Sequence, residues 1–299
     1  MRRLVVAAAL LIVACDSDTT TPEDAIVHTD RIGYHDAYAL GPNVASGDVR
    51  PILPAATILP PGASLIDLTH PFDDKTLYWP SDETGFELSS THRGRTEAGW
   101  FYAANNYSAP EHGGTHIDAP SHFAESGLNV DKLPLGRLLG PAVVIDISAD
   151  AEQNADALLE PAAIEAFEQQ HGPIAPNTIV LVRTGWSTRW PNRNAYLGDS
   201  RMGKTDALHF PGISEAAAKA LVLRQVSAVG IDTASLDNGP SRDFLAHRAL
   251  AAGDIPGFEN VTRLDMLPPT GALVLALPMK IANGTGSPLR IVAVVPPKH

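Results

Sequence analysis

The chain has 299 residues, 44% of them hydrophobic and 19% charged, which is enough for one large domain or two small ones with a buried core. Its 34 acidic and 22 basic residues give a formal net charge of -12 at pH 7, and no run of lysine or arginine follows the first few residues. Nucleic acid is not expected as a partner, because phosphate binding needs a basic stripe.

The first fifteen residues, "MRRLVVAAALLIVAC", have the pattern of a secretory signal. Two arginines precede an apolar run from Leu4 to Ala14 that is too short to span a membrane. The ending "IVAC" resembles a bacterial lipobox, in which cleavage before Cys15 lets its thiol carry lipid. We expect residues 1–14 to be a signal peptide and the mature protein to be extracytoplasmic, anchored to a membrane through Cys15. The alternative is a buried N-terminus with an incidental cysteine.

Residues 15–63 follow as a tether and an irregular arm, rich in Pro, Thr, Asp and Gly and without clear periodicity. Cys15 is the only cysteine of the chain. If it carries lipid, no internal disulfide can form, so the fold must be held together by its core.

Regular signals begin at Ser64. Short runs rich in β-branched residues, bounded by Gly, Pro, Asn or Ser, predict strands. These runs are "SLIDLTH", "GPAVVIDIS", "NTIVLVRTG", "VSAVGIDTAS", "GALVLALP" and "LRIVAVVP". Helices are predicted by "EPAAIEAFEQQHG", with Pro161 near its start and Gly172 past its end, and by "SEAAAKALVLRQ", with Ser214 as its N-cap. Alternating strands and helices indicate one α/β domain over residues 64–299.

The segment "EHGGTHIDAPSHF" has the residue types of a metal site. His112, His116, Asp118 and His122 lie at offsets 0, 4, 6 and 10. A helix would turn Asp118 about 240° away from His112, and the two glycines and the proline also disfavour a helix. In an extended strand the even offsets point all four side chains to one side, but the outer pair would be about 33 Å apart.

The chain must therefore bend if these side chains share a site, and Gly113, Gly114 and Pro120 are where it can. Imidazole and carboxylate together suit zinc or manganese, and the absence of thiolate argues against a structural zinc site. A polar loop whose histidines cap backbone groups is the alternative.

The segment "HGGTHIDAPSHF" resembles the H-x-G-T-H-x-D-x-P-x-H signature of the metal-dependent cyclase-like hydrolases, the superfamily of bacterial kynurenine formamidase and isatin hydrolase. Further segments resemble the family from about Ser64 to Pro296. They include "IDLTHPFDDKTLYWP", "TIVLVRTGW", "FLAHRALAAGDIPGFENVTRLDML" and "LPMKIANGTGSPLRIVAVV". The resemblance implies a swivelling β/β/α fold with a mixed sheet and flanking helices, assembled as a homo-oligomer.

The resemblance also implies roles for single residues. The metal ligands would be His112, His116, Asp118, His247 and Glu259. His122 would be the general acid/base, and Trp79 would line the substrate pocket. By themselves, His247 reads as a helix-face histidine, Glu259 as a surface carboxylate and Trp79 as core. Since this chain keeps Glu259, which some family members have lost, two divalent ions are expected, zinc or manganese.

The implied activity is hydrolysis of a C–N bond in a small amide by metal-activated water. An arylformamidase, a hydrolase of a cyclic amide such as isatin and an enzyme for another amide or lactone remain open. A lipid-anchored metal- or solute-binding protein without catalysis is the alternative of a different class. The loop "NGTGSP", Asn283 to Pro288, is interpreted either as a turn or as a backbone-amide cradle near the substrate.

Overall fold

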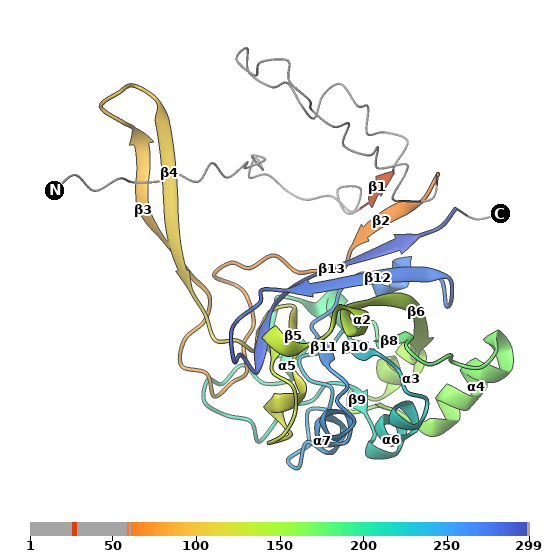
Figure 1. The fold of residues 1–299 in the computed structure, drawn as a ribbon. Helices are drawn as coiled ribbons and strands as arrows, with labels where there is room; N and C mark the ends of the chain where they lie inside the picture. The colour runs from red at the N-terminus through yellow and green to blue at the C-terminus, as the bar shows by residue number, and fades with distance from the viewer. Residues whose placement is uncertain (1–25, 29–58, 60, 298–299) are drawn as a thin grey trace.

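The computed structural model describes residues 26–28, 59 and 61–297 (Figure 1). The predicted signal peptide, the predicted lipid attachment site at Cys15 and nearly all of the predicted arm lie outside the described residues. No helix in the described part of the chain is both long enough and apolar enough to cross a membrane.

The six predicted strands and both predicted helices are present, together with further strands and helices. The strands are β1 (Ile26–His28), β2 (Ser64–Asp67), β3 (Glu87–Arg95), β4 (Phe101–Ser108), β5 (His116–Asp118), β6 (Leu139–Asp146), β7 (Leu158–Leu159), β8 (Ile179–Arg183), β9 (Gly212–Ile213), β10 (Ala228–Ile231), β11 (Gly257–Glu259), β12 (Ala272–Pro278) and β13 (Gly286–Val295). The helices are α2 (Leu135–Leu138), α3 (Ser148–Gln153), α4 (Pro161–His171), α5 (Arg193–Leu197), α6 (Glu215–Leu223) and α7 (Leu245–Ala252).

The large sheet is mixed and closes on itself. Its strand order is β1-β2-β13-β12-β6-β8-β10-β11-β5. Three neighbouring pairs are parallel: β6 with β8, β8 with β10, and β10 with β11. Strand β12 pairs antiparallel with β6 and with β13, and β5 pairs antiparallel with β11. Strand β13 also pairs with β5, so the strands from β13 to β5 form a ring (Figure 1). The predicted mixed α/β architecture is confirmed.

Strand β8 shows how the core is divided. Ile179 and Leu181 point into the ring, and Val180 and Val182 point outward to the helices. All four side chains are fully buried, as expected for a parallel strand that is covered on both faces. Figure 1 shows α4, α6 and α7 gathered on the outward side of this part of the sheet.

The predicted helix ends match the structure. Pro161 is the first residue of α4, and Gly172 ends that helix with a φ of 89°. The Ser214 side chain accepts a hydrogen bond of 3.1 Å from the backbone N–H of Ala217 at the start of α6. A cap of this kind stabilises a helix by about 1 kcal/mol.

The hairpin of β3 and β4 was not predicted from the sequence. It projects from the body of the molecule (Figure 1), and nearly all of its side chains are exposed, including Phe101 and Tyr107. Because neither strand packs one face against a core, the hairpin lacks the alternation of apolar and polar residues that makes a strand recognisable.

Candidate metal centre and active site

Strand β5 places the first candidate ligands. It is paired on both edges, with β11 and with β13, and all three of its residues are buried. Its alternation points Ile117 into the core and His116 and Asp118 to the opposite side. The antiparallel register sets Glu259 of β11 directly opposite His116. A residue 143 positions away in the chain thus lies beside the motif because of strand pairing.

The glycine pair bends the chain before β5. Gly114 adopts a φ of 56°, and its N–H donates a hydrogen bond of 2.9 Å to the carbonyl of Leu77. A Cβ on Gly113 would come within 2.1 Å of the Tyr78 ring. Both positions therefore need glycine, one for its backbone conformation and the other for close packing.

The chain turns again at Pro120, in a short 3-10 turn over Pro120–His122. The result is that the rings of His112 and His122 stack with centroids 3.8 Å apart and planes inclined by 21°. The two bends expected at the glycine pair and at the proline are present, and the ends of the motif meet.

Helix α7 supplies the distant histidine. His247 Nδ1 lies 2.6 Å from an Asp237 oxygen, and the same carboxylate accepts hydrogen bonds from the N–H groups of Ala246 and His247. Asp237 thereby orients the imidazole and caps the first turn of the helix. The Nε2 atom of His247 points at Asp118 Oδ2, 3.2 Å away, and at Glu259 Oε1, 2.9 Å away.

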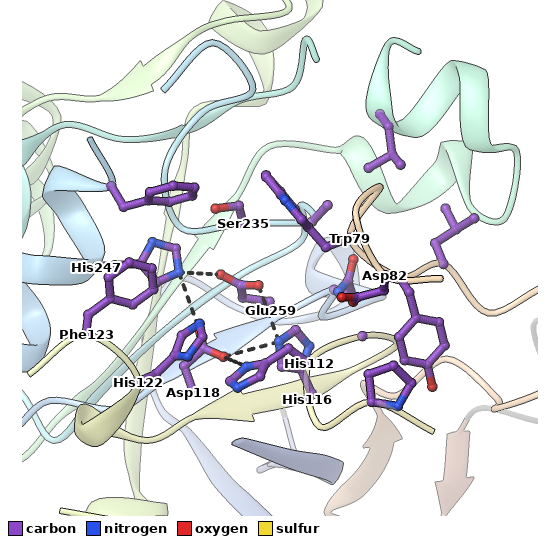
Figure 2. Close-up of a pocket in the computed structure, with 18 residues that line it drawn as sticks. Trp79, Asp82, His112, His116, Asp118, His122, Phe123, Ser235, His247 and Glu259 are labelled. Atoms are coloured by element: carbon purple, nitrogen blue, oxygen red, sulfur yellow. Dashed lines mark hydrogen bonds and ion pairs between the residues drawn. The ribbon is translucent and has the colours of Figure 1, made fainter. Parts of the chain in front are cut away.

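His116 approaches the same two carboxylates from the other side (Figure 2). Its Nε2 lies 3.2 Å from Asp118 Oδ1 and 3.4 Å from Glu259 Oε2. Each carboxylate therefore offers one oxygen to each imidazole. His116 Nδ1 donates to the carbonyl of Gly114 at 3.0 Å, and that carbonyl also accepts a 2.7 Å hydrogen bond from the Asn260 side chain.

The donor atoms fit a divalent cation. His116 Nε2 is buried and directed at the two carboxylates, and because Nδ1 contacts the Gly114 carbonyl, Nε2 is the ring nitrogen that would bind a cation. Two groups of candidate ligand atoms each lie within 4.8 Å of one another, and both contain Asp118. One group adds His112 and His122, and the other adds His116 and Glu259. Imidazole and carboxylate are the ligands of a zinc or manganese site.

Hydrogen bonds and charges hold protons inside this cluster. Burial opposes the protonation of His116, but the hydrogen bond and negative charge of Asp118, with the charge of Glu259, raise its pKa to about 9. The pKa of His247 lies well above its usual range despite burial, because Asp118, Asp237 and Glu259 hydrogen-bond to it. Bound protons therefore stabilise the metal-free centre at the atoms where a cation would bind.

His122 has the opposite behaviour. Partial burial lowers its pKa to about 4, and the positive charges of His112 and His247 act in the same direction, whereas Asp118 opposes them. Its ring lines the pocket and keeps an exposed surface. At neutral pH this imidazole is uncharged and able to accept a proton.

His112 is oriented by a chain of hydrogen bonds that was not predicted. Its Nδ1 lies 2.7 Å from Asp118 Oδ1, and its Nε2 lies 3.0 Å from the Thr285 hydroxyl. That hydroxyl donates to Glu111 at 2.9 Å, and the N–H groups of Thr285 and Gly286 bind the same oxygen. The loop "NGTGSP" is thus an amide cradle, but it holds a carboxylate of the protein. A Cβ on Gly286 would meet the His112 ring at 2.4 Å.

A cavity of about 320 Å³ opens onto the cluster, a size typical of small-molecule sites. All of the predicted site residues line it: Trp79, His112, His116, Asp118, His122, His247 and Glu259. Trp79 packs edge-on against Phe244, with ring centroids 6.1 Å apart, and Phe244 lies 5.4 Å from Phe123. One wall of the cavity is therefore aromatic, and the cluster of candidate ligands forms its floor.

Known proteins resemble this chain in sequence over most of its length. A sequence model of the Cyclase family matches residues 66–238. The isatin hydrolase of Roseibium aggregatum is 32% identical over 265 residues, which cover 86% of this chain and 96% of that protein. The chain belongs to the Cyclase family. The kynurenine formamidase of Salinibacter ruber, 30% identical, covers 77% of the chain and 96% of its own length.

Solved structures show the same fold. An isatin hydrolase A from Labrenzia aggregata, bound to benzyl benzoate, superimposes with a TM-score of 0.70 at 35% identity, covering 78% of this chain and 94% of its own. An isatin hydrolase bound to the product analogue thioisatinate gives a TM-score of 0.71 at 31% identity, covering 79% and 93%. The predicted family and fold are confirmed: this is a Cyclase-family chain related to hydrolases that act on amides, with His, Asp and Glu groups able to hold a metal.

Proposed function

We propose that this protein is a metal-dependent amidohydrolase that cleaves a C–N bond of a small aromatic amide. One observation carries the proposal: two segments more than a hundred residues apart bring His116 and His247 to the same pair of carboxylates, on the floor of an aromatic cavity. Isatin and N-formylkynurenine are the first substrates to test, because the related proteins are named for them.

The residues would divide the work as follows. The ligands would be His112, His116, Asp118, His247 and Glu259, with Asp118 and Glu259 shared between two ions. A divalent ion at such a site supplies a water of lowered pKa and a polarised substrate carbonyl. His122 would take the proton of the attacking water at one ring nitrogen and return it to the departing nitrogen of the amide. The wall containing Trp79 would hold the aromatic part of the substrate.

The test uses purified protein stripped of metal and then restored with zinc or manganese. Hydrolysis of N-formylkynurenine, isatin and related cyclic amides should appear only in the restored protein and should disappear with chelator. Bound metal is counted in the same samples. If the restored protein cleaves no amide or ester, the alternative of a metal- or solute-binding protein takes the place of the enzyme.

We also propose that Cys15 anchors the protein by lipid to the extracytoplasmic side of a bacterial membrane. The support is the sequence pattern of residues 1–15. Wild-type protein expressed in a bacterium should partition with membranes and be released by detergent, whereas Cys15→Ser should be found in the soluble fraction. Equal partitioning of the two would contradict the anchor.

A further inference from the structure

Ser235 is a residue of the cavity to which the proposed mechanism gives no role. It lies in the segment that leads from β10 to α7, is 3% exposed and lines the cavity. Within the described part of the chain, no residue makes a hydrogen bond with its side-chain hydroxyl. That oxygen reaches solvent, unlike the Tyr78 hydroxyl, which is buried in the same lining. The Ser235 hydroxyl is therefore available to a ligand.

Hydrogen bonds on both sides hold Ser235 in place. The Thr233 hydroxyl donates to the Ser235 carbonyl at 2.9 Å, and the Thr233 carbonyl accepts from the N–H of Asn260 at 2.8 Å. The N–H of Leu236 donates to Glu259 Oε1 at 2.8 Å. The backbone at Ser235 is thus tied to the end of β11, beside a candidate metal ligand. A donor held in this way needs little reorganisation when charge develops near it.

Ser235 and the proposed general acid/base, His122, lie on opposite sides of the candidate ligands. Figure 2 shows Ser235 above Glu259 and His122 beside Asp118. The ligand atoms of His122 and Asp118 belong to one group, within 4.8 Å of one another, whereas the backbone next to Ser235 binds Glu259. An amide that lies across this floor with its nitrogen at His122 would direct its carbonyl oxygen toward Ser235.

The chemistry of amide hydrolysis gives a hydroxyl at this point a use. The reaction passes through a tetrahedral intermediate whose oxygen is negatively charged, and a fixed hydrogen-bond donor lowers the energy of that intermediate. No lysine or arginine lines the cavity within the described residues, so no cationic side chain can take this role. Ser235 offers a neutral donor in their place.

The same hydroxyl is not placed to attack the substrate. A serine nucleophile needs a base within hydrogen-bond reach to take its proton. No histidine or carboxylate of the described chain makes such a bond with Ser235. The neighbouring His247 faces Asp237 with one ring nitrogen and the carboxylates of the centre with the other. The proton therefore stays on the Ser235 hydroxyl, where it can be donated in a hydrogen bond.

We propose that Ser235 is a catalytic residue whose hydroxyl donates a hydrogen bond to the substrate carbonyl oxygen as this oxygen becomes an oxyanion. The oxygen of water bonds to the carbonyl carbon, the C–N bond breaks, and a proton of the water passes through His122 to the departing nitrogen. Ser235 forms no covalent bond and keeps its proton. This inference rests on the proposed amidohydrolase function, but the binding of an anionic mimic can be measured without turnover.

The kinetic test compares zinc-loaded wild type, Ser235→Ala, Ser235→Thr and a matched control, Ser200→Ala. Ser200 is exposed and does not line the cavity. Ser235→Ala should lose about 10²- to 10³-fold in kcat with little change in KM, because the donor acts in the transition state. Ser235→Thr keeps a hydroxyl and should recover part of the loss, and the control should behave as wild type. Zinc content and melting temperature should not change in Ser235→Ala.

Benzylphosphonate and phenylacetate give a readout without turnover. Both are anions, but only the phosphonate has the tetrahedral oxygens of the intermediate. Calorimetry with zinc-loaded wild type should show a preference for the phosphonate, and this preference should fall by about ten- to a hundredfold in Ser235→Ala, the loss expected for one hydrogen bond to a charged group. Ser200→Ala should keep it.

The role of Ser235 is overturned if the phosphonate preference is the same in wild type and Ser235→Ala, or if wild type cleaves an amide and Ser235→Ala keeps its kcat. Loss of zinc from Ser235→Ala would make the residue a support of the metal centre, and a covalent acyl–Ser235 adduct in quenched wild type would make it the nucleophile. Either result also contradicts the proposal. If wild type cleaves no amide but the phosphonate preference depends on Ser235, the donor to an oxyanion stands and the amidohydrolase proposal fails.

Discussion

His116 and His247 present the same atom, Nε2, to the same two carboxylates, yet the chain orients their imidazoles by different means. His116 lies on β5, and its Nδ1 donates to a backbone carbonyl, that of Gly114. His247 lies on α7, and its Nδ1 faces the Asp237 carboxylate at 2.6 Å. One half of the centre is thus positioned by the backbone of a buried strand and the other by a charged side chain.

The two imidazoles therefore depend on different groups to stay in position. A backbone carbonyl stays in place whatever residue carries it, so His116 depends on the bend at Gly114 and on Asn260, which pins that carbonyl. Asp237, in contrast, is one replaceable side chain that makes its histidine a stronger ligand, since a carboxylate partner raises the basicity of the imidazole. Mutations can therefore separate the two halves.

The largest effect is expected from Asp118→Asn, which breaks both halves together. Asp118 contacts His112, His116 and His247, and an amide cannot replace the charge that a cation needs. Bound metal and turnover should both be lost, as measured by elemental analysis and amide hydrolysis. The exposed Asp265→Asn is the control and should behave as wild type. Unchanged metal content in Asp118→Asn would contradict its place in the centre.

His122→Ala should separate chemistry from metal binding. A general acid/base contributes about 10²- to 10⁴-fold to kcat, so turnover should fall by that factor while metal content stays at the wild-type level. The stacked neighbour His112 tests the opposite outcome, because its replacement by Ala should remove metal as well. If His122→Ala also lost metal, His122 would be a ligand. The positions of the ligand atoms allow this role, because those of His112, Asp118 and His122 lie within 4.8 Å of one another.

The two groups that orient the imidazoles can be compared directly with the variants Asp237→Asn and Asn260→Ala. Loss of the Asp237 charge should weaken metal binding by roughly 10- to 100-fold, since it removes the partner of His247 Nδ1. Asn260→Ala removes one hydrogen bond to the Gly114 carbonyl but keeps the carbonyl as the partner of His116, so it should weaken metal binding less. Competition with a chelating dye measures both affinities, and melting temperatures monitor the folded state. Equal losses in the two variants would show that the backbone is no better a support than the side chain.

The smallest effect expected is a pH dependence of stability in the metal-free protein. The pKa of His116 rises from 6.5 in the unfolded chain to about 9 in the folded protein, so its protonation stabilises the fold fully below pH 6.5. This contribution is lost as the pH rises through 9. The melting temperature of metal-free protein should therefore fall over that interval, and less so in His116→Gln. A melting temperature that stays level in both would refute the raised pKa.

Much of the fold could be predicted from local pattern. The runs that became β6, β8 and β10 are apolar and β-branched because both faces of these strands are buried. Helices α4 and α6 carry recognisable caps. The hairpin of β3 and β4 escaped prediction because it buries neither face, whereas His247 lies on a helix, α7, as its local sequence indicates.

For the candidate site, the sequence by itself determined the half contained in "EHGGTHIDAPSHF". Even spacing directs His116 and Asp118 to one side of a strand, and the glycines and proline allow the bends. Only the tertiary structure decided the rest. Glu259 meets His116 through the register of β11 against β5, and Asp237 meets His247 through the turn before α7. Local spacing governs the direction of a side chain along one strand, but neighbours across a closed sheet depend on pairing between distant segments, which no local pattern records.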